Sequence, residues 1–140
     1  MVFHFGNDQK AAVKIMKDKL MSMPVLNICR QNALTELHTD ASQKGFGAIL
    51  MPRVPSGKLH PIYYMSRKTL PSDEKMHSYF LEVKAVHIAF IKFSIYLLGI
   101  HFKLVTDCQA MVLIMKKNDL PAAVFRWILI FQEFSFDIEH

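Results

Sequence analysis

The sequence is poor in cysteine and lacks a long hydrophobic run, and each absence excludes a class of protein. Its 140 residues include two cysteines, Cys29 and Cys108, which lie far apart and form no CxxC pair. A disulfide scaffold and a zinc ribbon are therefore excluded, and free thiols in a reducing compartment are expected. The most apolar stretch, residues 86–100, is interrupted by a histidine, a lysine and a serine, so we expect no membrane span. The first five residues are too short and too soon polar for a signal peptide, so secretion is not expected.

The rest of the composition is that of one folded, mildly basic domain. Hydrophobic residues make up 51% of the chain and charged residues 21%, which argues against disorder. A chain of this length is expected to form one domain with a sizeable core. The net charge of +5 and the isoelectric point near 9.3 point weakly to a polyanionic partner.

Apolar periodicity and turn residues predict a mixed α/β fold. Three strands joined by short loops favour an antiparallel meander, and the strand–helix–strand passage after them predicts a parallel pairing with a right-handed crossover. The expected elements, in chain order, are a helix from Asn7 or Asp8 to about Met21, a connector over 25–33, strands at 34–39, 46–51 and 60–65, a long helix capped by Ser72 and ended by Gly99, a strand at 102–106, helices at 109–115 and 122–132, and a strand at 134–140.

Three acidic residues form the candidate site. Asp40 and Asp107 each follow a threonine at the end of a predicted strand. If the two strands are neighbours, the carboxylates lie close together and are stable mainly with a cation between them. Glu82 lies about midway along the long helix, on the stripe expected to face the sheet, where a carboxylate is costly unless paired or metal-bound. Oxygen ligands of this kind suit Mg²⁺ or Mn²⁺ and not zinc.

The residue pattern alone also allows a structural role for each acid. An aspartate after a strand is most often a turn or N-cap residue, and Asp107 can cap the helix expected at Gln109. Glu82 can lie at the solvated flank of its stripe. Spacing alone leaves the metal site and these structural roles both open.

The motifs that carry the three acids follow one another along nearly the whole chain. Residues 38–50 read His-Thr-Asp-Ala-Ser-x-x-Gly-x-Gly-Ala-Ile-Leu, and residues 60–67 read His-Pro-Ile-x-Tyr-x-Ser-Arg. The further motifs are Pro-Val-Leu at 24–26, Leu-Glu-x-x-Ala at 81–85, Tyr-Leu-x-Gly at 96–99, Thr-Asp-Cys at 106–108, Arg-Trp at 126–127 and Asp-Ile-Glu-His at 137–140. In this order of motifs the chain strongly resembles the ribonuclease H domain of Ty3/gypsy-type LTR retrotransposon polyproteins, particularly those of arthropods.

The resemblance implies an RNase H-like fold, a mixed five-stranded sheet flanked by helices. It implies endonucleolytic hydrolysis of the RNA strand of RNA–DNA hybrids during reverse transcription, with two Mg²⁺ ions for which Mn²⁺ can substitute. Asp40, Glu82 and Asp107 match three catalytic metal ligands of the family. Residues 1–33 resemble the tail of the polymerase connection region, and residues 34–140 resemble the RNase H-like domain without its C-terminal helix.

The resemblance also implies partners and a location. The expected partners are an RNA–DNA hybrid and the reverse transcriptase polymerase domain of the same polyprotein, with no membrane. The expected location is the cytoplasm, in a virus-like particle, or the nucleus.

The sequence departs from the family pattern at several positions. The family has a fourth metal-ligand aspartate on a later helix, and this sequence ends at His140 before it. Lys84 replaces a leucine beside the catalytic glutamate, and Phe80 replaces a frequent glutamate. An impaired activity is therefore expected. The alternative is a catalytically impaired or inactive domain with a nucleic-acid-binding or structural role; an integrase-like member of the same superfamily fits the acid spacing less well.

Five polar or cationic residues are candidates for substrate binding. Ser42 and Gln109 follow two of the acids and can hydrogen-bond the substrate backbone or a ribose 2′-hydroxyl, or cap local structure instead. Cations near the site can contact phosphates, although a solvated surface is the better expectation for any one of them. The full set is Ser42, Lys44, Ser66, Arg67 and Gln109.

Overall fold

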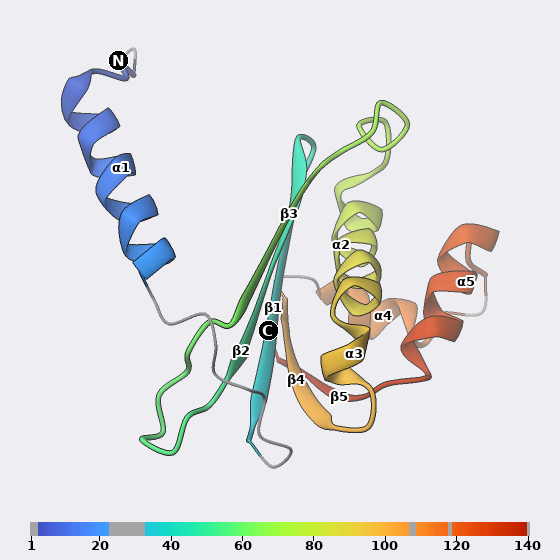
Figure 1. The fold of residues 1–140 in the computed structure, drawn as a ribbon. Coiled ribbons are helices and arrows are strands. Elements are labelled where there is room, and N and C mark those ends of the chain that lie inside the picture. Colours follow the sequence, from blue (N-terminus) through green and yellow to red (C-terminus); the bar gives the residue numbers. More distant parts are fainter. Residues whose placement is uncertain (1–2, 23–32, 107–108, 118, 140) are drawn as a thin grey trace.

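A computed structural model describes residues 3–22, 33–106, 109–117 and 119–139 of the chain (Figure 1). Most of the predicted connector at 25–33 lies outside these residues. So do both cysteines and Asp107.

The described residues form a five-stranded sheet in the order β3-β2-β1-β4-β5. The strands are β1 (Thr35–Ser42), β2 (Gly45–Pro52), β3 (Tyr63–Lys68), β4 (His101–Thr106) and β5 (Ser135–Glu139). β1, β2 and β3 pair in antiparallel fashion, while β4 pairs in parallel with both β1 and β5. The predicted meander and the parallel strands are therefore confirmed, and the architecture is the mixed five-stranded α/β sheet that the resemblance implies.

Helices cover one face of this sheet. Figure 1 shows α2 (Ser78–Lys92), α3 (Ser94–Leu97), α4 (Gln109–Ile114) and α5 (Ala122–Phe131) on the same side. β2 shows why, because its side chains are alternately buried and half-buried, as expected for a strand with one face in the core. The packing of α2 on β1 forms the centre of the molecule.

Phenylalanine rings fill much of the core between α2 and the sheet. Phe90 of α2 is fully buried. Its ring centroid lies 5.4 Å from that of Phe102 on β4, 5.2 Å from that of Phe131 on α5 and 5.1 Å from that of Phe136 on β5. The edge-to-face angles of these pairs, 68° to 87°, are those that aromatic rings prefer. These contacts fix α2 over the parallel half of the sheet.

The start of the long helix differs from the prediction. The helix begins at Ser78 and not after Ser72, and its N-cap is His77, whose ring nitrogen Nδ1 accepts a hydrogen bond of 3.3 Å from the Tyr79 amide. A turn occupies residues 71–76 instead, where Asp73 accepts a 3.0 Å hydrogen bond from the Leu70 amide. Pro71 favours a turn here, because it occupies the second position of a turn closed by a 2.8 Å hydrogen bond from the Asp73 amide to the Leu70 carbonyl oxygen.

The end of that helix and the third strand also differ in detail. α2 ends at Lys92 with Phe93 as its C-cap, and α3 follows. Gly99 then adopts a positive φ of 82°, which favours glycine. The third strand begins at Tyr63, three residues later than predicted, and extends to Lys68. Pro61 lacks an amide hydrogen and interrupts a regular ladder before it.

The helix α1 (Asn7–Ser22) forms as predicted, and its described side chains are exposed. Figure 1 shows it standing apart from the sheet. The division of the chain at residue 33 stays a prediction. Within the described part of the chain, no helix has the length and apolar character needed to cross a membrane.

Candidate active site

Asp40 lies near the end of β1 with an exposed side chain. Among the described residues its carboxylate has no hydrogen bond or ion pair. The adjoining turn is closed by Ser42, whose Oγ accepts hydrogen bonds of 3.2 Å from the amides of Lys44 and Gly45. The turn role that an aspartate often has at such a position is therefore taken by Ser42, and the Asp40 carboxylate is available for another partner.

A row of three residues crosses the antiparallel strands at Asp40. Asp40 is the register partner of Gly47, and Gly47 is that of Ser66. Register partners share a face of the sheet, and this face is the one opposite α2. A Cβ added at Gly47 would come no closer than 4.0 Å to another atom, the Met65 carbonyl oxygen. Asp40 and Ser66 are thus separated by a position with free space above it.

That space is part of a shallow hollow of about 490 Å³. The hollow lies on the sheet surface opposite α2, the open face, which is formed by Asp40, Gly47, Ile49, Tyr64 and Ser66. Half-buried or exposed side chains alternate on these strands with the buried ones beneath α2. The hollow is lined by the Asp40 carboxyl group, the exposed Tyr64 ring and the Ser66 hydroxyl.

The strand that precedes Asp107 is placed as predicted. Thr106 ends β4 and is the parallel register partner of Thr39, the residue before Asp40. Asp107 follows Thr106 in the sequence but lies outside the described residues, so its predicted convergence with Asp40 stays a prediction. The two threonine hydroxyls are buried, and neither has a hydrogen bond within the described residues.

Glu82 occupies the second turn of α2. It is the fifth residue of the helix and not near its middle, because the N-cap of α2 is His77, five residues after the predicted cap Ser72. The residue is half-buried, and its oxygen Oε2 is shielded from solvent. The helical spacing indicates a core-facing position for Glu82, and this prediction is confirmed in part. The Glu82 side chain is half-buried, whereas its neighbours Leu81 and Val83 are fully buried.

A small apolar cluster connects the surroundings of Asp40 and Glu82. Phe46 of β2 packs with Leu81 and Ala85 of α2, and Ala41 and Met76 pack against them. Ala41 is the neighbour of Asp40 in the chain, and Leu81 is the neighbour of Glu82. The end of β1 and the start of α2 therefore meet at this cluster, although no group of three acidic, histidine or cysteine side chains gathers within the described residues.

The donor set fits a hard divalent cation. Asp40 and Glu82 offer carboxylate oxygens, the ligands that Mg²⁺ and Mn²⁺ prefer. The exposed Asp40 side chain leaves open positions for water or substrate at a bound ion. The chemistry of these two residues is thus compatible with the predicted metal, and Asp107 would add a third ligand of the same type.

The predicted substrate contacts lie mostly at the same end of the sheet. Ser42 and Lys44 belong to the β1–β2 turn, and Ser66 and Arg67 lie near the end of β3 with exposed side chains. Gln109 is the first residue of α4 and is exposed. Ser42, Lys44 and Ser66 thus lie near Asp40, whereas Arg67 is the register partner of Phe46 and lies on the α2 face of the sheet. The role of all five residues in binding stays a prediction.

An ion pair near this site was missed from the sequence. Lys84 of α2 donates a hydrogen bond to Oδ1 of Asp73 in the turn before the helix. Asp73 is 2% exposed. Burial by itself would raise the pKa of Asp73, but the hydrogen bonds from Lys84 and the Leu70 amide outweigh it and lower that pKa. The sequence signal was the lysine itself, a charged residue on a helix predicted to pack against the sheet.

Comparison with known proteins identifies the family. The sequence profile described as the RNase H-like domain found in reverse transcriptase matches residues 30–134. The chain belongs to this family. The match covers the first four strands and includes Asp40, Glu82 and Asp107.

Two curated relatives of this RNase H-like domain are polyproteins. The chain is 29% identical over 132 residues to the enzymatic polyprotein of figwort mosaic virus (strain DxS), covering 91% of this chain and 20% of the relative. It is 28% identical over 138 residues to the retrovirus-related Pol polyprotein from transposon 412 of Drosophila melanogaster, covering 99% and 11%. The chain thus spans a fifth or less of the length of these relatives.

Solved structures share the fold. The crystal structure of prototype foamy virus protease-reverse transcriptase superposes with a TM-score of 0.77 at 13% identity, over 99% of this chain and 19% of that one. The crystal structure of LC11-RNase H1 in complex with an RNA/DNA hybrid superposes with a TM-score of 0.53 at 12% identity, over 76% and 83%. Both agree with the RNase H-like architecture of the described strands.

Proposed function

We propose that this RNase H-like domain hydrolyses the RNA strand of RNA–DNA hybrids in a metal-dependent reaction within a reverse transcriptase polyprotein. The observation that carries the proposal is the Asp40 carboxylate, which is exposed and has no protein partner among the described residues. An exposed carboxylate at a rigid strand end is a ligand that a metal-dependent nuclease needs. The apolar cluster of Phe46, Leu81 and Ala85 joins this end of the sheet to the helix turn that carries Glu82.

Asp40, Glu82 and Asp107 would hold the metal. Two Mg²⁺ ions supply an activated water and stabilisation of the leaving 3′-oxygen in phosphodiester hydrolysis. The chain's own contribution is to keep the Asp40 carboxylate accessible at the sheet surface and to carry Glu82 on a helix fixed by the core. Mn²⁺ would substitute for Mg²⁺, because both ions prefer oxygen ligands.

A nucleic-acid duplex suits the surroundings of Asp40. Lys44 and Arg67 are exposed cations at the same end of the sheet and can contact phosphates. The relative LC11-RNase H1, of the same fold, was crystallised with an RNA/DNA hybrid. Both relatives described above are polyproteins, and we infer that the polymerase domain acts beside this domain in the same chain.

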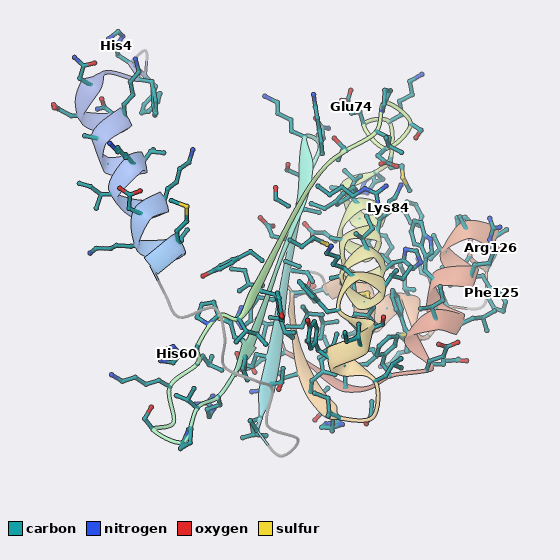
Figure 2. All side chains as sticks on the ribbon, viewed as in Figure 1. His4, His60, Glu74, Lys84, Phe125 and Arg126 are labelled. Atoms are coloured by element: carbon teal, nitrogen blue, oxygen red, sulfur yellow. The ribbon has the colours of Figure 1, made fainter. Side chains whose placement is uncertain are left out.

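The test is a cleavage assay with the folded chain on a hybrid labelled in the RNA strand, with Mg²⁺ and then Mn²⁺. We expect RNA cleavage that is lost in Asp40→Asn, Glu82→Gln and Asp107→Asn. Glu74→Gln is the matched control, because Glu74 is an exposed acid in the turn before α2 (Figure 2). Cleavage that persists in Asp40→Asn would exclude this site as its source.

Hybrid binding without cleavage by the wild-type chain would favour the alternative of an inactive domain with a nucleic-acid-binding role. Gel shifts with the same hybrid, in EDTA and in Mg²⁺, separate these outcomes. Binding that falls when Lys44 and Arg67 are both replaced by methionine would locate the duplex at this end of the sheet.

A further inference from the structure

The connection between β3 and α2 is attached at both ends to elements of the candidate site. At its start, the Thr69 hydroxyl donates a 2.6 Å hydrogen bond to the Gln43 carbonyl oxygen, and the Thr69 amide donates one of 3.3 Å to the Lys44 carbonyl oxygen. Thr69 is buried. The connection is therefore joined to the β1–β2 turn, two residues beyond the Asp40–Ala41 segment.

At its other end the connection is joined to α2 by the Lys84–Asp73 ion pair. Asp73 uses both carboxylate oxygens, since Oδ1 accepts from the Lys84 ammonium and Oδ2 from the Leu70 amide. The Asp73 carbonyl oxygen accepts a further 2.8 Å bond from the Met76 amide. With 2% exposure for Asp73 and a Lys84 side chain that is 20% exposed, the pair is largely shielded from water. Figure 2 shows Lys84 on α2 below the loop that carries Glu74.

Lys84 lies two positions after Glu82 on α2. Successive residues of an α-helix are rotated by about 100°, so the two side chains leave the helix about 200° apart. The apolar cluster of Phe46, Leu81 and Ala85 holds one side of this helix turn, and the ion pair holds another. Sliding or rotation of the first two turns of α2 would break one of these contacts.

We infer that Lys84 and Asp73 are positioning residues, which set the place of Glu82 relative to Asp40 and so the geometry of the metal site. The inference rests on the proposed function. Replacing a residue that holds a metal ligand in place typically lowers the metal affinity by about tenfold or more.

The experiment is a Mn²⁺ titration of the full chain, followed by paramagnetic broadening of the Ala41 and Leu81 amide signals, at a temperature at which every variant is folded. We expect Lys84→Met to weaken binding about tenfold and Lys84→Arg to restore most of it. Lys92→Met is the control, because Lys92 is an exposed lysine on the same helix. Should Lys84→Met not fold, Asp73→Asn gives the same test, because its amide oxygen can still accept from the Leu70 amide.

The outcomes separate the two proposals. If the wild type binds Mn²⁺ and both Lys84→Met and Asp73→Asn bind it with the same affinity, the positioning role alone is overturned, whatever the melting temperatures of the variants. A wild type whose Ala41 and Leu81 signals do not respond to Mn²⁺ overturns the metal site and the positioning role together. A loss of melting temperature with unchanged affinity shows a purely structural ion pair.

Discussion

Thr39 and Thr106 face each other across the parallel pair of β1 and β4, one residue before each strand's acid, and both hydroxyls are buried without a hydrogen bond in the described residues. A buried hydroxyl that lacks a partner costs about 1–3 kcal/mol of stability. We therefore expect Thr39→Val to raise the free energy of unfolding by about 1 kcal/mol, measured by urea denaturation.

The matched control for this prediction lies on the same strand. Thr35 is also buried, but its hydroxyl donates a 3.1 Å hydrogen bond to the Ala33 carbonyl oxygen. Thr35→Val should therefore lower the free energy of unfolding by about 1 kcal/mol. Equal losses in both variants would show that the Thr39 hydroxyl has a partner in the folded chain.

Two glycines of β2 should respond differently to alanine. A Cβ at Gly47 has open space, whereas one at Gly45 would lie 3.1 Å from the Arg67 carbonyl oxygen, which is backbone and cannot move away cheaply. Gly47→Ala should leave the melting temperature nearly unchanged and reduce hybrid cleavage, since the methyl group enters the hollow between Asp40 and Ser66. Gly45→Ala should lower the melting temperature by several degrees, consistent with a loss of about 1 kcal/mol. Full cleavage by Gly47→Ala would show that substrate does not enter the hollow.

The lowered pKa of His87 predicts that the folded chain loses stability in mild acid. Its ring stacks on that of Trp127, with centroids 5.4 Å apart, and burial together with the Lys84 charge lowers the pKa of His87 below its ordinary value of 6.5. The unfolded chain then binds a proton more readily than the folded one, so the free energy of unfolding falls as the pH decreases below about 6.5. Urea denaturation at pH 7.5 and 5.5 measures this difference. His87→Phe keeps an aromatic ring and should reduce it; an unchanged pH dependence would assign the effect to other groups.

The lowered pKa of Asp73 predicts a second loss of folding stability, at lower pH than that of His87. Its lowered pKa means that the folded chain keeps the carboxylate ionised below the ordinary value of 3.8. The stabilisation is present above pH 3.8 and is lost as the pH falls through the lower folded value. Asp73→Asn should cost about 3 kcal/mol at pH 7, because it leaves Lys84 without its charged partner in a shielded site. The difference between the wild type and this variant should narrow in acid, and a constant difference from pH 7 to pH 3 would contradict the assignment.

Local patterns in the sequence were enough to predict the order of strands and helices along the chain, whereas the residues of the candidate site stay a prediction. The alternation in 46–51 and the helical stripe around Ala85 and Ala89 each depend on residues that are close in the chain, and both are borne out. The motifs indicated an RNase H domain of a reverse transcriptase, which the profile match over residues 30–134 confirms, while the Ty3/gypsy subtype stays a prediction. Hydrophobic periodicity is a strong signal because every turn or pleat repeats it.

Contacts between distant residues decided the rest. The helix begins at Ser78 because Asp73 bonds to both Leu70 and Lys84, eleven residues on, and Thr69 is held by Gln43, twenty-six residues before it. The exposure of Asp40 follows from the register of β1 on β2, which puts its side chain opposite the buried face. Such pairings depend on how separate elements pack in space. The local pattern of residues does not determine which distant residues come into contact.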